Sequence, residues 1–560
     1  MKYRVITNTA ENMLTAKYLK LLAPYTDSVS SDEVCKAESE IVLGKTNREI
    51  SKKAEALLEK ITEGEVGYAV LAEGGSIAAV WSDFHMEEAA IEALSDKLPE
   101  MNDGFVLSVT TELMPYLEER GRKIVEKKWA ELEERLDPEY APEIIAAMKD
   151  LYKIFVDRKM VEWEANLYDA KIGGWYCSDS ARDNEPYLPD IESTYVALSF
   201  LGSSGMCEMF DGNWTLGVPR WLKDKVANFF LSLQDEDSFF YHPQWPKSFI
   251  IENNKQARIT RDRGTAFGVL KKLGREPKYS EPKKVESADT PRMMTQFESV
   301  ENFRAYIKGL EDEVCAIESA NERAAKFYFY GNLFQSSTGY LIENEEMKNI
   351  FIEFLEKYQN PENGMWADTV CYHGTNGLHK LADTANKIGY KLSYIDQMVN
   401  SVLEIINYDA QNHPAAGAVY IYNAWSCFPY IYENILKYGD GTPEERMAKK
   451  KEVERRVLKA APAALRACVD QMYAFKREEG GFSYGRGASS GINQGCPSSV
   501  PGVREAGLGG NSIAVTALKL YIFRALELPE EAIPPVFTEY ERMIYMDILE
   551  RLNEKAQKGN

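Results

Sequence analysis

The spacing of hydrophobic and polar positions changes near residue 110. Before that point, short alternating or continuous apolar runs predict strands at residues 2–7, 39–45 and 103–109. Helical stripes predict helices at residues 11–25, 47–61 and 87–98. Residues 67–81 have the pattern of a hairpin that turns at Gly74-Gly75, because glycine adopts the backbone angles of a tight turn. We therefore predict a small α+β accessory domain over residues 1–112.

From about residue 140 the pattern is helical and it repeats. The unit is a long amphipathic helix, a loop with glycine and an aromatic residue, and a second helix that opens with small residues. The loop is clearest in SLQDEDSFF, KYQNPENGMW and KREEGGFSY, and three further copies are less regular. One such unit cannot bury its apolar face alone, so neighbouring units must stack.

Six helical hairpins closing on themselves give the predicted fold class, a mainly α (α/α)6 toroid over residues 144–560 that follows a helical linker at 113–143. Small residues such as Gly264 and Gly377 would let its inner helices pack closely. An open helical solenoid is the alternative architecture.

Two resemblances follow from these motifs. The order of EIVLGKTNREIS, the hairpin GYAVLAEGGSIAAVW and the helix near His85 resembles the non-catalytic N-terminal domain of β-hexosaminidases and α-glucuronidases. That resemblance implies a carbohydrate-processing context and no catalytic residue. The Leu-x-x-x-Gln-(Asn/Asp)-x-x-Gly-(Phe/Trp) character of the repeat is similar to terpenoid-cyclase and protein-prenyltransferase toroids, and the same turn occurs in (α/α)6 glycoside hydrolases and polysaccharide lyases. It implies a fold more than a chemistry.

The composition limits the partners. Hydrophobic residues make up 44% of the 560 residues and the formal net charge is −21, so a nucleic acid or an anionic membrane would be repelled. We see no secretory signal and no apolar run of membrane-spanning length, and the eight cysteines are scattered. We expect a cytoplasmic protein with reduced thiols and leave its oligomeric state open.

The loops that enter the inner helices are the predicted place for chemistry. In a toroid these loops open at one end, where helix N-termini offer unpaired N–H groups. The loops are residues 174–192, 238–263, 364–376, 409–423 and 482–511.

Glycoside hydrolysis needs two carboxyl groups on either side of the scissile bond. The residues nominated as catalytic are Asp368, Asp183, Glu192, His373 and Glu505. Two alternatives stay open, because Asp190 beside Glu192 is either a helix cap or part of the site, and Glu505 is either functional or only an ion-pair partner of Arg504.

Aromatic, histidine and arginine side chains in the same loops suit sugar rings and sugar carboxylates. The nominated substrate-binding residues are Trp175, Tyr176, His242, Trp245, Arg261, Arg263, Trp366, Tyr372, His413, Tyr484 and Arg486. For Trp366 we favour the structural alternative, in which the ring fills the core beneath its loop.

The predicted function is a glycoside hydrolase that acts on an oligosaccharide with two carboxylates. A lyase acting on a uronate is the alternative, with Tyr372, His373, Tyr484 or Arg486 as base, acid and charge neutraliser. A non-catalytic glycan-binding toroid and a prenyl- or terpenoid-handling toroid are further alternatives. We expect no cofactor and no metal, because the zinc-binding residue types in the 368–373 segment depart from the prenyltransferase spacing. Sugar and linkage stay open.

Overall fold

The structure is a computed structural model that describes residues 2–8, 15–242, 244–245, 247–252, 256–280, 295–489, 491–493 and 495–558. The chain divides into two compact units, Met1–Ile124 and Val125–Asn560. The division falls inside helix α4 (Leu113–Arg135), within the segment expected to be a helical linker.

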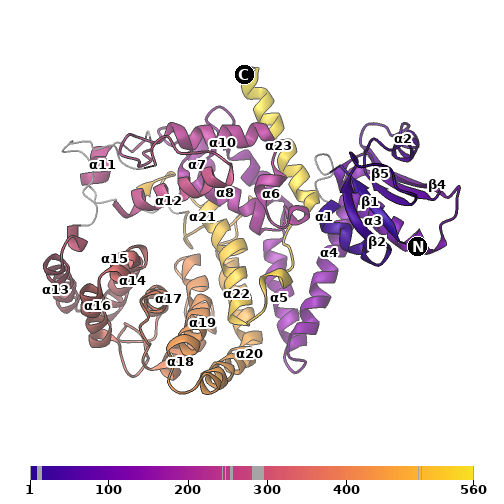
Figure 1. The fold of residues 1–560 in the computed structure, drawn as a ribbon. Helices are drawn as coiled ribbons and strands as arrows, with labels where there is room; N and C mark the ends of the chain where they lie inside the picture. The colour runs from indigo at the N-terminus through magenta and orange to yellow at the C-terminus, as the bar shows by residue number, and fades with distance from the viewer. Residues whose placement is uncertain are drawn as a thin grey trace. The chain divides into compact units, whose positions relative to one another are not determined.

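The first unit is a mixed sheet with short helices (Figure 1). Its strands are β1 (Tyr3–Thr7), β2 (Thr26–Ser31), β3 (Glu40–Leu43), β4 (Glu65–Glu73), β5 (Ser76–Trp81) and β6 (Val106–Glu112). Its helices are α1 (Thr15–Tyr18), η1 (Leu19–Tyr25), α2 (Glu49–Ala56), η2 (Phe84–Met86), α3 (Glu87–Lys97) and η3 (Leu98–Glu100). The predicted α+β class is confirmed, and the part of the predicted 11–25 helix before Thr15 lies outside the described residues.

The sheet order is β2-β1-β3-β5-β4-β6. β1 pairs in parallel with β2 and β3, β3 pairs in parallel with β5, and β4 is antiparallel to β5 and β6. The β4–β5 hairpin turns where predicted, since Gly74 and Gly75 have φ angles of 61° and 77°. Strand β2 was not predicted, because its sequence, TDSVSS, has one apolar residue and no alternation of apolar and polar positions.

The second unit is almost wholly helical, which confirms the mainly α class. Its α-helices after α4 are α5 (Ala141–Phe155), α6 (Arg158–Asn166), α7 (Asp179–Asp183), α8 (Ile191–Ser203), α9 (Trp214–Gly217), α10 (Arg220–Ser232), α11 (Lys247–Glu252), α12 (Gln256–Lys272), α13 (Val300–Ala316), α14 (Ala320–Ser336), α15 (Thr338–Glu343), α16 (Glu345–Tyr358), α17 (Tyr372–Ile388), α18 (Ile395–Ile406), α19 (Ala418–Tyr438), α20 (Pro443–Tyr473), α21 (Leu508–Asn511), α22 (Lys519–Ala525) and α23 (Glu539–Gln557). Its other elements are η4 (Glu208–Phe210), η5 (Thr295–Phe297), the π-helix η6 (Ser512–Leu518), η7 (Glu530–Ala532), β7 (Tyr168–Asp169), β8 (Gly174–Trp175), β9 (Ile492–Asn493) and β10 (Cys496–Pro497).

The second helices of the hairpins pack against one another in series. α14 contacts α17, α17 contacts α19, α19 contacts η6 and α22, η6 contacts α8, and α8 contacts α12 (Figure 1). Helices α12 and α17 lie far apart in this series, yet Arg261 of α12 is close enough to Lys380 of α17 to influence its pKa. The series therefore curves around a common interior, and its closure into a complete toroid stays a prediction.

Gly264 and Gly377, the two small residues expected at close helix contacts, have different surroundings. A Cβ built on Gly377 of α17 would lie 3.6 Å from the backbone nitrogen of Tyr328 in α14, so the two helices do approach closely there. Among the residues that the structure describes, a Cβ built on Gly264 of α12 would meet no atom within 4 Å. The expectation that Gly264 lets inner helices crowd together is therefore wrong, because that face of α12 borders open space.

The glutamine that recurs in the repeat stabilises the turn that follows the outer helix. The Nε2 atom of Gln359, just after α16, donates to the carbonyl oxygens of Gly364 (2.9 Å) and Ser393 (3.1 Å). The Trp366 ring, 1% exposed, fills the core beneath this turn, and its Nε1 donates to the carbonyl of Leu355 (2.9 Å). This is the structural role favoured for Trp366.

The same contact recurs in two other copies. After α10, Gln234 Nε2 donates to the carbonyl of Tyr279 at 2.8 Å and lies 3.4 Å from that of Ser238. After α20, Lys476 takes the place of the glutamine, and its Nζ donates to the carbonyl of Ile154 at 2.9 Å. A side-chain donor that joins each turn to a distant segment is therefore a shared device of the hairpins.

The eight cysteines are all free, as expected from their scatter. Within the described ranges, no helix is both long enough and apolar enough to cross a membrane.

We predict that Gln359→Leu lowers the free energy of unfolding by about 1–3 kcal/mol, because the buried carbonyl of Gly364 and the partly buried carbonyl of Ser393 lose their donor. Chemical denaturation monitored by circular dichroism measures this. Gln557→Leu, on the exposed end of α23, is the matched control and should change stability by less than about 0.5 kcal/mol. Equal effects of the two substitutions would contradict a structural role for the Gln359 contact.

Candidate functional site

A short backbone bridge fixes the loop of residues 482–511 to the start of α19. The amide of Ala418 donates to the carbonyl of Tyr484 (3.0 Å), and the amide of Arg486 donates to the carbonyl of Ala416 (3.1 Å). Buried Arg477 supports the bend, since its guanidinium donates to the carbonyl of Arg486 at 2.9 Å. Tyr484 and Arg486 are therefore held beside the first turn of α19, which carries Tyr420.

The Tyr420 ring contacts the start of α17. The His373 ring lies 5.2 Å from it at 66°, and the Tyr372 ring lies 6.0 Å from it at 29°. The Tyr372 hydroxyl accepts from Gln471 Nε2 (3.1 Å) and donates to the carbonyl of His413 (3.3 Å). The half-exposed His413 ring itself stacks on Tyr408 at 4.1 Å. Polar groups from four separate segments thus meet around Tyr420.

Two polar groups in this region are buried without a hydrogen-bond partner among the described residues. They are Nδ1 of His373 and one terminal nitrogen of Arg486. Burial lowers the pKa of His373, so its imidazole is neutral at neutral pH and able to accept a proton. Arg486 is close enough to Tyr372 to oppose the rise in the Tyr372 pKa that burial causes. Unpaired buried polar groups in a native structure need an explanation, and a ligand supplies one.

An ion pair joins α8 and α12 on the same interior. Glu192 accepts two hydrogen bonds from Arg261, at 2.9 Å from Nε and 2.6 Å from a terminal nitrogen. The Glu192 side chain is 8% exposed, whereas Arg261 is 48% exposed. Arg261 reaches Tyr422 and Tyr484 electrostatically, and burial raises the pKa of both phenols far above their ordinary value. Both phenols therefore stay protonated at neutral pH.

Lys380 of α17 is the cation that the sequence analysis missed. Burial, with Arg261 nearby, lowers the pKa of Lys380 to about 8. Its neighbour Asp383 accepts instead from Gln335 (2.6 Å) and Lys387 (2.7 Å). Within the described part of the chain, the Lys380 ammonium makes no hydrogen bond or ion pair. It is a free cation on the helix that also carries His373.

We call this group of residues the central cluster. Its members are Glu192, Arg261, Tyr372, His373, Lys380, Tyr420, Tyr422, Tyr484 and Arg486. Six of them were nominated from the sequence. The signal for Lys380 was available, because positions 373 and 380 lie two turns apart on one face of a helix. Tyr420 and Tyr422 were not nominated because they lie in the mostly apolar segment AVYIYNAW, whose pattern predicts core residues.

Three nominated acids are engaged elsewhere. Asp368 is 49% exposed and forms an ion pair with Arg323 at 2.8 Å. Asp183 is 57% exposed and pairs with its neighbour Arg182 at 2.7 Å.

Glu505, in contrast, is 4% exposed. It accepts from the Ser178 hydroxyl and the Ser180 amide, each at 2.8 Å. Glu505 thereby joins the sixth loop to the first, and its carboxylate oxygens are already occupied.

Asp190 caps α8, which resolves the alternative left open for it. Its carboxylate accepts from the amide (2.9 Å) and the hydroxyl (2.8 Å) of Ser193. Buried Arg258 lies 3.3 Å from the same carboxylate and binds Asp262 at 2.8 Å. Burial raises the pKa of Asp262 to about 7, against the lowering effect of Arg258.

The remaining nominated aromatic and histidine residues contact protein groups. Trp175 is completely buried in the core with its ring 4.6 Å from that of Tyr168, although its Nε1 has no hydrogen-bond partner among the described residues. The Tyr176 hydroxyl donates to Asp169 at 2.9 Å. Buried Trp245 donates from Nε1 to the carbonyl of Pro497 at 2.9 Å and lies 4.6 Å from the ring of His242.

His242 and Arg263 likewise bind protein groups. Nε2 of His242 lies 2.5 Å from the carbonyl oxygen of Pro189. Arg263 donates to the Ser238 hydroxyl (3.2 Å) and to the carbonyl of Ser280 (3.0 Å). These contacts connect loops, so the two residues lie in the walls of the second loop rather than in the central cluster.

Comparison of the chain with protein-family models, with curated proteins and with solved structures found no match. Across the described residues, no three His, Cys, Asp or Glu side chains are grouped as metal ligands would be.

We predict that Glu505→Ala lowers the free energy of unfolding by about 1–3 kcal/mol, because the buried Ser180 amide and the hydroxyls of Ser178 and Ser180 lose their acceptor. Asp183→Ala, at an exposed ion pair, should cost less than about 1 kcal/mol. Thermal unfolding of the two variants measures the difference. Unchanged stability of Glu505→Ala would contradict the joining role of this carboxylate.

Proposed function

We propose that this chain is a carbohydrate-active enzyme that cleaves an acidic oligosaccharide by β-elimination at a uronate. The supporting observation is the unpartnered Nδ1 of neutral His373 beside Tyr420, with cations and phenols around it. Elimination requires a base, a proton donor and a cation for the sugar carboxylate, and the central cluster contains all three types. The resemblance of the first unit to an accessory domain of carbohydrate-processing enzymes supports the same substrate class.

The reaction assigns one role to each type of group. Lys380 and Arg486, the cations with unoccupied donors, bind the uronate carboxylate and stabilise the negative charge that develops on it. His373 Nδ1 removes the proton on C5. The electrons of the C5–H bond form the C4–C5 double bond as the bond from C4 to the glycosidic oxygen breaks. A phenol then gives its proton to that oxygen.

Tyr484 and Tyr420 are the candidate proton donors. Burial holds both phenols protonated by raising the pKa of each. Tyr484 also lies close enough to Arg261 and Glu192 for both charges to influence its pKa. After turnover the proton held by His373 is returned to the phenolate directly or through water, so the protein regains its starting state.

Glycoside hydrolysis is the second candidate function. It is favoured by Glu192, the nominated carboxylate that borders the central cluster from a buried position. Hydrolysis needs a second carboxyl group across the bond, and the other nominated acids bind Arg323, Arg182 or two serines instead. The two functions give different products, since elimination leaves an unsaturated uronate that absorbs ultraviolet light and hydrolysis leaves only a new reducing end.

We predict that His373→Ala reduces kcat for elimination by about 10²–10⁴-fold, because the general base is lost. The assay follows the absorbance of unsaturated uronate released from galacturonate and glucuronate oligomers. Added imidazole should restore part of the activity of His373→Ala, a rescue that a purely structural role would not give. Full activity in this variant, or new reducing ends without absorbance, would reject elimination by His373.

We predict a loss of substrate affinity above about pH 8. Lys380 is positively charged below its pKa of about 8 and neutral above it, so the attraction for a uronate weakens as pH rises through that value. Burial is the main cause of this low pKa; among the charged neighbours, Arg261 and Lys387 lower it further and Asp383 raises it. KM measured from pH 6 to 10 should rise near pH 8 in the wild type and rise only at higher pH in Lys380→Arg. An identical profile in Lys380→Met would show that another group titrates.

A further inference from the structure

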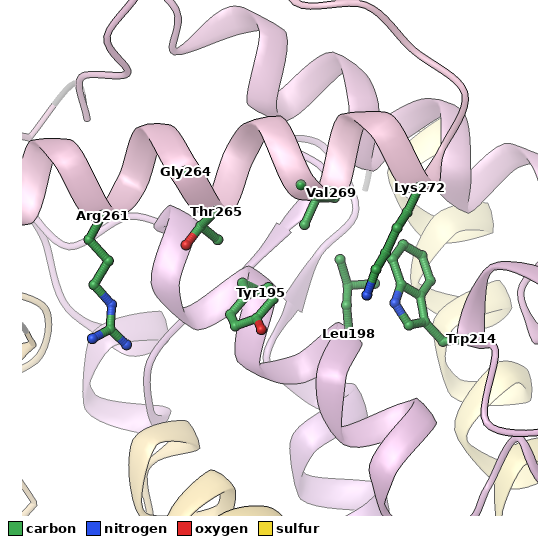
Figure 2. Close-up of a pocket in the computed structure, with 9 residues that line it drawn as sticks. Tyr195, Leu198, Trp214, Arg261, Gly264, Thr265, Val269 and Lys272 are labelled. Atoms are coloured by element: carbon green, nitrogen blue, oxygen red, sulfur yellow. The ribbon is translucent and has the colours of Figure 1, made fainter. Parts of the chain in front are cut away.

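A groove between α8 and α12 begins at Arg261 of the central cluster. It encloses about 390 Å³, and Arg261, Thr265 and Lys272 of α12 and Tyr195 of α8 line it. In Figure 2 the Arg261, Thr265 and Lys272 side chains all point from α12 to the side on which Tyr195 lies. The groove and the central cluster therefore share one cation.

The wall formed by α12 has no side chains at two positions. A Cβ built on Gly264 or Gly268 would meet no atom of the described residues within 4 Å, and neither glycine has a positive φ angle. Glycine is disfavoured inside a helix, and here neither close packing nor an unusual backbone requires it. Because the two glycines have no side chains, they leave the volume of the groove open.

A cationic side chain lies at each end of the groove. Arg261 and Lys272 are eleven residues apart, which places them about 16 Å apart along the helix axis. Lys272 has no ion pair or hydrogen bond within the part of the chain that the structure describes, whereas Arg261 shares its charge with Glu192. An extended ligand with more than one negative group matches this spacing better than a compact anion does.

The middle of the groove suits a sugar ring. The Tyr195 side chain is 39% exposed, so part of its ring is open to a ligand, and Leu198 and Trp214 continue the apolar wall. The C–H face of a pyranose packs on aromatic surface, while the Thr265 hydroxyl can hydrogen-bond to a sugar hydroxyl. Apolar wall, hydroxyl and flanking cations together match an acidic oligosaccharide.

We infer that this groove is a second subsite, which binds the uronate units that extend beyond the one held in the central cluster. The inference rests on the proposed function for its substrate class, and it adds that the ligand is an oligomer. Lys272 binds a carboxylate at the far end, and Tyr195 stacks on the sugar between the two cations.

The test uses two substitutions that act on the groove in different ways. Gly268→Leu fills it on a helix face with space for a side chain, and Lys272→Ala removes its outer cation. Lys271→Ala is the matched control, because Lys271 is the adjacent exposed lysine and does not line the groove. Each is combined with His373→Ala, so that calorimetric titration reports binding without turnover.

The probes are galacturonate oligomers and glucuronate-containing hyaluronan oligomers of two and six sugar units, with a neutral cellohexaose for comparison. We expect Gly268→Leu and Lys272→Ala to weaken binding of an acidic hexamer about tenfold and to leave the dimer unchanged. The Lys271→Ala control should alter neither. Equally tight binding of cellohexaose would overturn the role of the cations.

The same variants with His373 intact are then assayed for unsaturated product. Turnover with no difference between hexamer and dimer in any groove variant would overturn the subsite and leave the proposed function standing. Hexamer binding that the groove substitutions weaken, without formation of unsaturated product, would support the subsite and reject elimination. Absence of binding by every acidic oligomer would overturn both.

Discussion

The second unit depends on how each outer helix ends. The last carbonyl groups of a helix have no partner inside it, and the chain must turn there toward the interior. In three hairpins one side-chain donor, Gln234, Gln359 or Lys476, binds carbonyl groups of the turn or of a distant segment. This contact fixes where the next helix begins, so it also fixes the position of everything that α17 presents to the interior.

Buried polar groups in this unit fall into two kinds. One kind is fully partnered: Asp190 and Asp262 share Arg258, and Glu505 binds two serines. Such networks hold loops together, and their donors and acceptors are already used within the protein. The other kind has atoms that lack partners in the described chain. It includes His373 and Arg486 around Tyr420, and also Glu164, Tyr168, Trp175 and Tyr545. What distinguishes the groups around Tyr420 is that they lie among phenols and cations.

Periodicity predicted the fold class, the hairpin at Gly74-Gly75 and the helical repeats, because those features depend on local spacing. It missed β2, whose place in the sheet comes from backbone pairing with β1 and not from apolar side chains. The site was only partly predictable for a related reason. Asp368 has the loop position of a catalytic acid, but its partner Arg323 lies 45 residues away in the sequence. In the sequence Lys380 has the pattern of an ordinary helix residue, and only folding places Arg261 near it.

The bridge between the 482–511 loop and α19 affects how long the central cluster stays assembled. Two backbone hydrogen bonds, from the amides of Ala418 and Arg486, and the guanidinium of Arg477 hold Tyr484 and Arg486 in place there. Opening these contacts breaks fewer hydrogen bonds than unfolding a helix does, so we expect this segment to open more often than the helices around it. Hydrogen exchange at these two amides therefore reports how often the central cluster comes apart while the helices around it stay intact.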